Sequence, residues 1–161
     1  MVRLANKIDL DEIWSVYLDA REFMRQTGNA SQWGDFYPTI PMLEQDIERN
    51  ELYVVERSGV ICGVFLFAKG PDPWYAEIDD GEWKSDEPYS VIHRVAAKAG
   101  VKGIFAECLD FALRNDQHLR IDTHEDNKVM QHVLEKNGFI RCGIVYVHER
   151  KSPRIAYELI K

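Results

Sequence analysis

The sequence has no apolar run near the roughly 18 residues that would cross a bilayer, and its N-terminus lacks the basic and apolar regions of a signal peptide. It has only three cysteines, Cys62, Cys108 and Cys142, and they are far apart, which excludes a disulfide scaffold and a cysteine zinc site. Each lies in an apolar context, where a cysteine is usually a small buried side chain. We therefore expect a cytoplasmic protein without a membrane partner.

Basic residues are scarce: 20 lysines and arginines stand against 27 acidic residues, for a formal net charge of −7. This balance argues against a nucleic-acid partner, because phosphate binding depends on clustered Lys and Arg. The charge is uneven, since residues 69–87 carry −5 of it, whereas residues 88–106 contain no acid and hold Arg94, Lys98 and Lys102. An acidic segment is therefore followed at once by a basic one.

Internal repeats, low-complexity tracts and linkers are also missing, so we expect residues 1–161 to form one domain. Hydrophobic periodicity predicts the element order β-α-α-β-β-β-α-β-α-β-β, which is a mixed α/β sheet. The predicted strands are residues 2–5, 52–56, 60–68, 89–97, 119–123, 139–147 and 154–160, and the predicted helices start near residues 9, 41, 104 and 126. Residues 69–87 exceed the usual limit of ~12–15 residues for a connection, and such long connections are often functional.

A strand, a glycine-containing loop and a helix follow one another in residues 92–104. The first N–H groups of a helix have no partners within the helix, and the helix dipole adds positive charge there, so this turn suits a phosphate or pyrophosphate. Gly100 and Gly103 permit close approach of the backbone, and Lys98 and Lys102 add full charges. The loop is neither a Walker loop nor a complete dinucleotide-binding motif. An ordinary strand-to-helix turn is the alternative.

A second pattern runs from the strand at residues 119–123 to the ending Leu134-Glu135-Lys136-Asn137-Gly138-Phe139, with Asn127 at the start of the helix between them. It resembles the GNAT superfamily of acyl-CoA-dependent N-acetyltransferases, and more narrowly its small, mostly bacterial members. In that family the glycine loop binds the cofactor pyrophosphate, and the family's element order matches essentially the whole chain. The resemblance implies a central twisted mixed β-sheet of six to seven strands flanked by about four helices.

The resemblance also implies acetyl-CoA as the co-substrate, with its pantetheine arm along the strand at residues 89–97, and no metal. The implied cofactor-binding residues are Val95, Ala96, Ala97, Lys98, Gly100, Val101, Lys102, Gly103, Ile104 and Asn127. The chain departs from the family pattern at Phe105, where the loop usually has Gly or Ala, and at Leu134, where many members have the Tyr that protonates the departing thiolate. The implied reaction is direct attack of a neutral primary amine on the acetyl carbonyl.

Such an attack needs a base, because an alkyl amine with a pKa of about 10.4 is mostly protonated near pH 7. His93 is our first candidate and His124 our second, since an imidazole titrates near that pH and both lie on or just after strands that would flank the cofactor. The alternatives are that His93 packs on the sheet and that His124 helps Asp126 cap the next helix. Tyr146 is a candidate thiolate acid, against the alternative of a core tyrosine.

Aromatic residues of two loops are the candidate acceptor-binding residues, namely Trp33, Tyr37, Trp74 and Trp83. A hydrophobic lid over the sheet is the alternative interpretation. If the carboxylates of residues 69–87 border the pocket, they would steer a cationic acceptor toward it. We expect the acceptor to be a small-molecule or peptide amine, and an edge strand at residues 154–160 could pair two copies into a homodimer.

Two other functions remain open at this point. A CoA-binding or partner-binding module without turnover is consistent with Phe105 and Leu134. A metal-dependent hydrolase is consistent with Asp122, His124 and Asp126, because carboxylate and imidazole ligands suit divalent ions. Against the metal site, the predicted strand ends before His124 and Asp126 is a natural helix cap. We favour the N-acetyltransferase.

Overall fold

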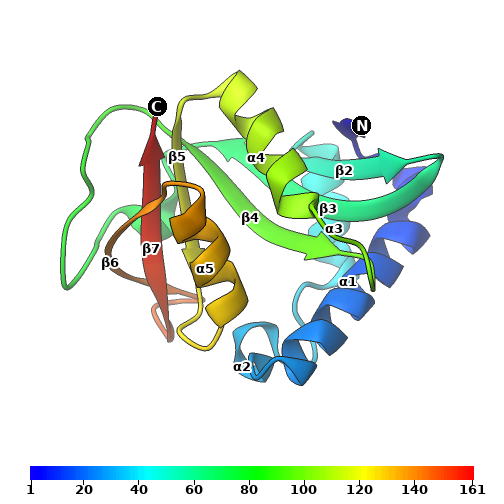
Figure 1. Ribbon diagram of the computed structural model, residues 1–161, viewed down its shortest axis with the longest axis horizontal. Coiled ribbons are helices and arrows are strands. Elements are labelled where there is room, and N and C mark those ends of the chain that lie inside the picture. Colours follow the sequence, from blue (N-terminus) through cyan, green and yellow to red (C-terminus); the bar gives the residue numbers. More distant parts are fainter.

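Seven strands form one sheet in the computed structural model, which describes residues 1–161. The strands are β1 (Val2–Leu4), β2 (Leu52–Arg57), β3 (Val60–Lys69), β4 (Ser90–Ala97), β5 (His118–Thr123), β6 (Ile140–Val147) and β7 (Ser152–Ile160). Their order in the sheet is β1-β2-β3-β4-β5-β7-β6, and only the β4–β5 pair is parallel (Figure 1). The predicted mixed sheet and its order of strands along the chain are confirmed. The prediction of an edge strand at residues 154–160 is wrong, because β7 pairs with β5 on one side and with β6 on the other.

Five α-helices accompany the sheet: α1 (Leu10–Gln26), α2 (Ala30–Trp33), α3 (Ile40–Glu48), α4 (Ile104–Asn115) and α5 (Lys128–Lys136). Short 3₁₀ turns occupy η1 (Lys7–Asp9) and η2 (Pro73–Tyr75). The four predicted helices are present, and α2 is an additional single turn that overlaps the start of residues 32–38, called the aromatic loop here. None of the helices is long and apolar enough to span a membrane.

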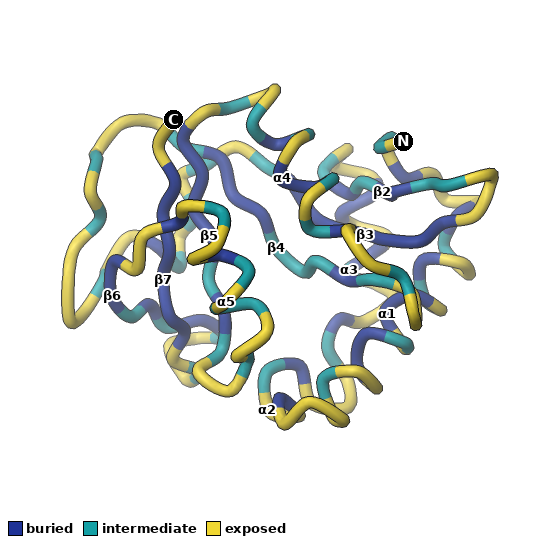
Figure 2. Tube along the Cα trace, in the orientation of Figure 1, coloured by how far each residue is buried: buried dark blue, intermediate teal, exposed yellow.

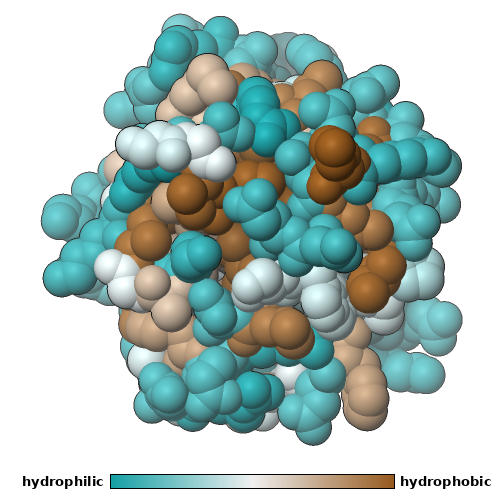
Figure 3. Space-filling view, turned by 90° about the vertical axis from the view of Figure 1, so that its right-hand side faces the viewer, coloured by the Kyte–Doolittle hydropathy of each residue, from teal (hydrophilic) through white to brown (hydrophobic).

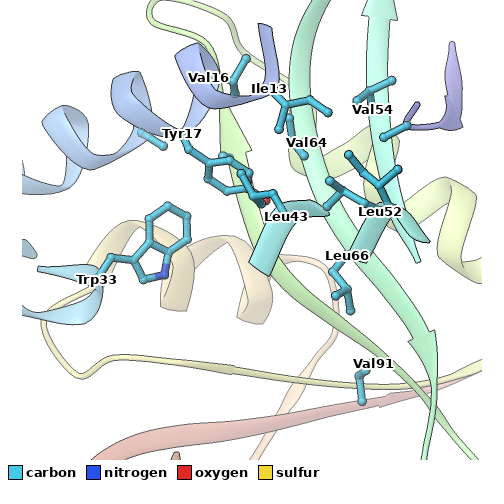
Figure 4. Close-up of a cluster of buried hydrophobic side chains, with 14 of the residues drawn as sticks. Ile13, Val16, Tyr17, Trp33, Leu43, Leu52, Val54, Val64, Leu66 and Val91 are labelled. Atoms are coloured by element: carbon cyan, nitrogen blue, oxygen red, sulfur yellow. The ribbon is translucent and has the colours of Figure 1, made fainter. Parts of the chain in front are cut away.

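The helices cover the sheet on both faces, as strand alternation requires. Val54 and Val64 belong to one core with α1 and α3, whereas their neighbours Val55 and Phe65 belong to a second core with α4 and α5. Figure 4 shows side chains of α1 and α3 meeting those of β2 and β3 in the first core, with Trp33 of α2 on the side of Tyr17. In Figure 2 the strands form the buried centre of the molecule, and exposed residues are concentrated in loops and on the outer sides of helices. Figure 3 shows hydrophobic side chains grouped near the middle of one face, with hydrophilic ones around them.

The sheet is split between β4 and β5. These strands pair only at Ser90↔Leu119 and Val91↔Arg120, and beyond that point they separate (Figure 1). On its other side β4 carries a bulge, where the register with β3 shifts and Arg94 adopts a φ of 51°. A bulge bends and twists its strand, so this one turns the second half of β4 away from β5.

Side chains from three segments hold the bulge in place. The Tyr17 hydroxyl of α1 donates to the Arg94 carbonyl at 2.8 Å. The Arg94 guanidinium donates to the Tyr37 hydroxyl at 3.1 Å and forms an ion pair with Asp46 of α3. A positive φ at a non-glycine residue costs on the order of 1–3 kcal/mol, and these buried contacts offset that cost.

The connection between β3 and β4, residues 70–89, is called the insert here. It covers the half of the sheet that α1 and α3 leave open: Tyr75 is buried in the first core, and Asp79 forms a bridge with Ile144 of β6. Contact is so close that a Cβ atom on Gly81 would lie 1.9 Å from the Cys142 carbonyl oxygen, so only glycine fits there. The insert is therefore part of the packed structure, although its tip projects beyond β6 and β7 (Figure 1).

A buried carboxylate anchors the far end of the insert. Glu158 of β7 accepts hydrogen bonds from the Lys84 N–H at 2.7 Å and from Arg120 Nε at 2.8 Å, and it pairs with His118 at 2.6 Å. The Arg120 guanidinium lies between the rings of Trp83 and Tyr89, at 4.1 and 4.0 Å from their centres. Burial opposes ionisation of Glu158, but these donors outweigh it and lower the pKa below its ordinary 4.5.

We predict that Glu158→Gln lowers the free energy of unfolding by about 3 kcal/mol at pH 7, because it leaves the buried Arg120 without its counter-charge. A carboxyl with a lowered pKa stabilises the fold above its unfolded pKa, and the stabilisation is lost as the pH falls through the folded value. As the pH falls below 5, the free energy of unfolding should therefore decrease less in the variant than in the wild type. Denaturant titrations across pH measure this, with Glu77→Gln as a surface control; equal acid sensitivity of the two variants would contradict it.

Candidate active site

The split between β4 and β5 opens into a cavity of about 390 Å³. Its walls come from the second half of α1, the end of β4, the start of α4 and one side of α5. Beyond Val91 the side of β4 that faces this cavity has no partner strand, so its backbone groups are free to bind an extended ligand. At one end lies the start of α4, where Gly103 has a φ of 83° and the first-turn N–H groups have no partners within the helix.

The sequence-predicted cofactor residues mostly line this larger cavity. Those that do are Val95, Ala96, Ala97, Lys98, Val101, Gly103, Ile104 and Asn127. Gly100 and Lys102 belong to the same loop but are exposed and do not line the cavity. Phe105 is part of the wall, and its ring packs at 6.4 Å from that of Phe139. Arg57, which the sequence did not single out, donates to the Lys102 carbonyl at 3.0 Å and so holds the loop.

A second cavity of about 60 Å³ lies beside the first, between β4, β5 and the aromatic loop. Met24, Val95, Asn127 and Met130 line both cavities, so the two meet at the split in the sheet. Asn127 caps α5 by accepting from the Met130 N–H at 3.0 Å, and its amide donates to Gln32 of α2 at 2.9 Å. The contact between Asn127 and Gln32 joins the start of α5 to α2 beside the junction of the two cavities.

His93 faces the smaller cavity from β4. In a regular strand His93 and Arg94 would point to opposite faces, but the bulge lets both line this cavity. The His93 Nε2 atom lies 2.7 Å from Asp72 Oδ2 of the insert, and its Nδ1 atom lies 3.8 Å from Asp122 Oδ2 of β5. Burial opposes ionisation of Asp72, yet the hydrogen bond and charge of His93 outweigh it and lower the pKa of this carboxyl.

The aromatic residues predicted to bind an acceptor are divided by the structure. Trp33, Tyr37 and Trp74 line the smaller cavity, whereas Trp83 packs against Tyr75 and Arg120 and lies away from it. The proposed role of the insert as an acidic border is largely wrong, because its other carboxylates are exposed and only Asp72 contacts His93. Both earlier interpretations therefore hold in part: some of the aromatic residues form a pocket and some form a lid.

His148 and Arg154 were not anticipated from the sequence, and both line the smaller cavity. His148 packs edge-on against Tyr37 and Trp74, with ring centres 5.0 and 5.2 Å apart. Burial and the nearby charge of Arg154 lower the pKa of His148 below 6.5. The turn that carries His148 has positive φ at three successive residues other than glycine, so no glycine marks it in the sequence.

Two candidate catalytic residues are not brought to either cavity. His124 accepts from the Asp126 N–H at 3.0 Å, so it organises the turn before α5. The helix cap itself is Asn127 and not Asp126, which corrects the capping alternative. Tyr146 lies on the edge strand β6 with Arg150 over its ring at 5.2 Å. The side chain of Leu134 is fully buried in the second core. Neither Tyr146 nor Leu134 therefore lines either cavity.

The metal-site alternative is not supported by the geometry. Asp122 faces His93 and accepts from the Tyr75 hydroxyl at 2.6 Å, whereas His124 and Asp126 form the turn before α5. No group of three or more His, Cys, Asp and Glu side chains is arranged to hold a metal ion. Asp122, His124 and Asp126 therefore do not converge on one point, as a metal-dependent hydrolase would require.

Solved structures of other proteins share this arrangement of strands and helices. A GNAT-family acetyltransferase from Streptococcus agalactiae aligns over 100% of this chain and 95% of its own, with 29% identity and a TM-score of 0.88. The chain resembles the GNAT superfamily in fold and in sequence. The fold is also that of a GNAT acetyltransferase from Listeria monocytogenes (22% identity, 98% and 92% of the chains, TM-score 0.72). The sequence matches no protein-family model and no curated protein.

A more distant GNAT-fold structure is the NatB acetyltransferase complex bound to CoA and MES, with 12% identity, a TM-score of 0.67 and 100% and 99% of the chains aligned. The predicted GNAT-like fold is confirmed by these neighbours, which are acetyltransferases. The likeness to these acetyltransferases supports a general acetyltransferase function.

We predict that the ring protons of His148 and His124 titrate with midpoints below 6.5, because burial and the Arg154 charge disfavour both imidazolium ions. Both rings should therefore be mostly neutral at pH 7. NMR titration of the imidazole C–H resonances, assigned with His148→Gln and His124→Gln, measures the midpoints. A value at or above 6.5 for His148 would contradict its packing between Tyr37 and Trp74.

Proposed function

We propose that the protein transfers the acetyl group of acetyl-CoA to a primary amine by direct attack. The observation that carries this proposal is the meeting of two cavities at the β4–β5 split, with His93 facing the smaller one. One cavity accommodates a long, largely apolar ligand and the other a small polar one, as a two-substrate transfer requires. The CoA bound in the NatB complex supports the choice of cofactor for this fold.

The larger cavity would hold CoA. Its free β4 edge can accept the pantetheine amides as an added strand, and the N-terminus of α4 can bind the pyrophosphate. Lys98 lines the cavity and contributes a positive charge. Phe105 forms part of the wall but leaves the cavity open at about 390 Å³, so this departure from the family loop does not close the site.

The smaller cavity would hold the acceptor amine. One water needs roughly 10–15 Å³ of such space, so about 60 Å³ accommodates a group of only a few heavy atoms. Trp33, Tyr37 and Trp74 supply apolar walls, and His93 is the base at the cavity surface. Removing the amine proton is necessary, because a neutral amine has the lone pair that attacks the acetyl carbonyl.

Acetyl-CoA supplies the activated acetyl group, and this chain would stabilise the charge that develops on its carbonyl oxygen. A backbone N–H on the unpaired side of β4 is the donor that we assign to this role, and one such preorganised donor can contribute about 3 kcal/mol. Leu134 occupies the position where many family members have the tyrosine that protonates the thiolate, and leucine cannot supply a proton. The thiolate would therefore take its proton from solvent or from the amine.

The proposal predicts that the protein releases CoA thiol from acetyl-CoA only when an amine is added. A panel of alkyl amines, amino acids and N-terminal peptides, followed by thiol detection and mass spectrometry of the product, tests it. Acetylated amine at one CoA thiol per product is the expected result. Tight CoA binding without amine-dependent release would instead support the alternative of a non-catalytic binding module.

A pair of lysines tests the cofactor position. Lys98→Glu should raise the acetyl-CoA KM about tenfold, equivalent to about 1.4 kcal/mol, because it places a carboxylate in the phosphate-binding end of the cavity. Lys102→Glu is the matched control, since Lys102 is four residues along the same loop but does not line the cavity. Steady-state kinetics and CoA titration compare the two, and equal effects would show that only overall charge matters.

A further inference from the structure

Three side chains from two parts of the chain surround the His93 ring. Asp72 and Tyr75 come from the insert, at its η2 turn, and Asp122 comes from β5. Nε2 of His93 lies 2.7 Å from Asp72 Oδ2, and Tyr75 donates to Asp122 Oδ2 at 2.6 Å. Asp122 lines the smaller cavity but Asp72 does not, so Asp72 lies behind the ring, as seen from the cavity.

This geometry fixes which ring nitrogen can take a proton. Asp72 accepts also from the Trp74 N–H at 2.9 Å, and the lowered pKa of Asp72 keeps it a carboxylate. A carboxylate can only accept hydrogen bonds, so Nε2 of His93 carries the hydrogen and donates it to Asp72. In the neutral ring the lone pair is then on Nδ1, on the side of Asp122 and the cavity.

Between Nδ1 and Asp122 there is room for one more group. The two atoms are 3.8 Å apart, too far for a hydrogen bond to each other. A nitrogen with several hydrogens can lie about 2.8 Å from both and donate to both. An alkyl ammonium has this shape and a charge opposite to that of Asp122.

The other charged groups near the ring are already paired or lie farther away. Arg154 Nε is 3.9 Å from Asp122 Oδ1, and Arg94 is occupied by Asp46 and Tyr37. His148 lies across the Trp74 ring from His93. Asp72 and Asp122 are therefore the charges that act on His93 most directly.

We propose that Asp122 binds the acceptor as an ammonium ion, that His93 Nδ1 takes its proton, and that Asp72 positions the ring and stabilises the imidazolium. This relay rests on the proposed acetyltransferase function. The ammonium loses one proton to Nδ1, and the freed lone pair forms the N–C bond to the acetyl carbonyl. The C–S bond breaks, a second N–H proton neutralises the thiolate, and His93 returns its proton to solvent.

The relay defines the class of acceptor. Alkyl amines are protonated near pH 7 and would bind between Asp122 and His93 as cations. Aryl amines are neutral at that pH, so they lack the charge that Asp122 would hold. The enzyme should therefore acetylate alkyl amines with a kcat/KM at least tenfold above that for aryl amines of similar size. Equal values for the two classes would overturn the ammonium site.

Asp72→Asn tests the positioning role. Asparagine keeps the shape and the acceptor for the Trp74 N–H but removes the charge, so an imidazolium is less stabilised. We expect kcat to fall at least tenfold, the acid limb of the kcat–pH profile to move to lower pH, and the acetyl-CoA KM to stay unchanged. Glu77→Gln is the control: it removes a carboxylate of the same insert, one paired with exposed Arg150, and should leave the profile unchanged.

Asp122→Asn tests the binding role. It retains an acceptor for the Tyr75 hydroxyl, and it should raise the KM for alkyl amines about tenfold while leaving the KM for aryl amines unchanged. A uniform rise for both classes would show a purely structural effect and overturn the assignment.

NMR of the His93 ring nitrogens separates failure of the relay from failure of the proposed function, because it needs no substrate. In the wild type the neutral ring should carry its hydrogen on Nε2, toward Asp72. An active enzyme whose neutral His93 ring carries the hydrogen on Nδ1, and whose acid limb does not move in Asp72→Asn, would overturn the relay and retain the acetyltransferase. A wild type without amine-dependent thiol release would overturn the acetyltransferase and the relay's catalytic role, whatever the NMR spectrum shows.

Discussion

The bulge at Arg94 is the constraint on which the site depends. A strand that continued to pair with β5 beyond Val91 would close the sheet and leave no cavity. The bulge bends β4 away, and it also brings His93 and Arg94 to the same cavity. Its conformation is held by Tyr17, Asp46 and Tyr37, which come from α1, α3 and the loop between α2 and α3. The first helices therefore do more than cover the sheet, because they hold the split open.

The order of strands and helices could be predicted because it depends on local periodicity and on glycine and proline positions. Gly138 ends α5 and Pro41 opens α3 as expected, since these residues restrict or permit backbone angles regardless of the rest of the chain. The glycine loop before α4 could be placed for the same reason. Its detailed contacts could not, because exposure of Lys102 and the approach of Arg57 depend on how β2 packs beside the loop.

The active-site residues were harder to predict, and His93 and His124 show why. His93 lies within β4 and His124 directly follows β5, so both are histidines on or next to the two strands at the split. What separates them is tertiary: His93 lies between carboxylates that come from positions 72 and 122, whereas His124 accepts from a backbone N–H two residues away. His148 and Arg94 gave no signal, because each adopts a positive φ without being glycine. A backbone conformation of this kind is imposed by packing and leaves no mark in the residue type.

Most of the negative charge concentrated in residues 69–87 lies on the exposed surface of the insert and does not line the smaller cavity. The acids of the insert repel one another and most remain in water, where the solvent screens them. Buried polar contacts attach the insert at both ends. Glu158 and Arg120 bind its far end, and Asp72 contacts His93 at its near end. Because Tyr75 also joins the insert to Asp122, the segment that covers the sheet supplies two of the groups around His93. Packing of the insert and the position of the His93 ring, the proposed base, are thus one structural requirement, and a change that loosened the insert would disturb this ring before it unfolded the sheet.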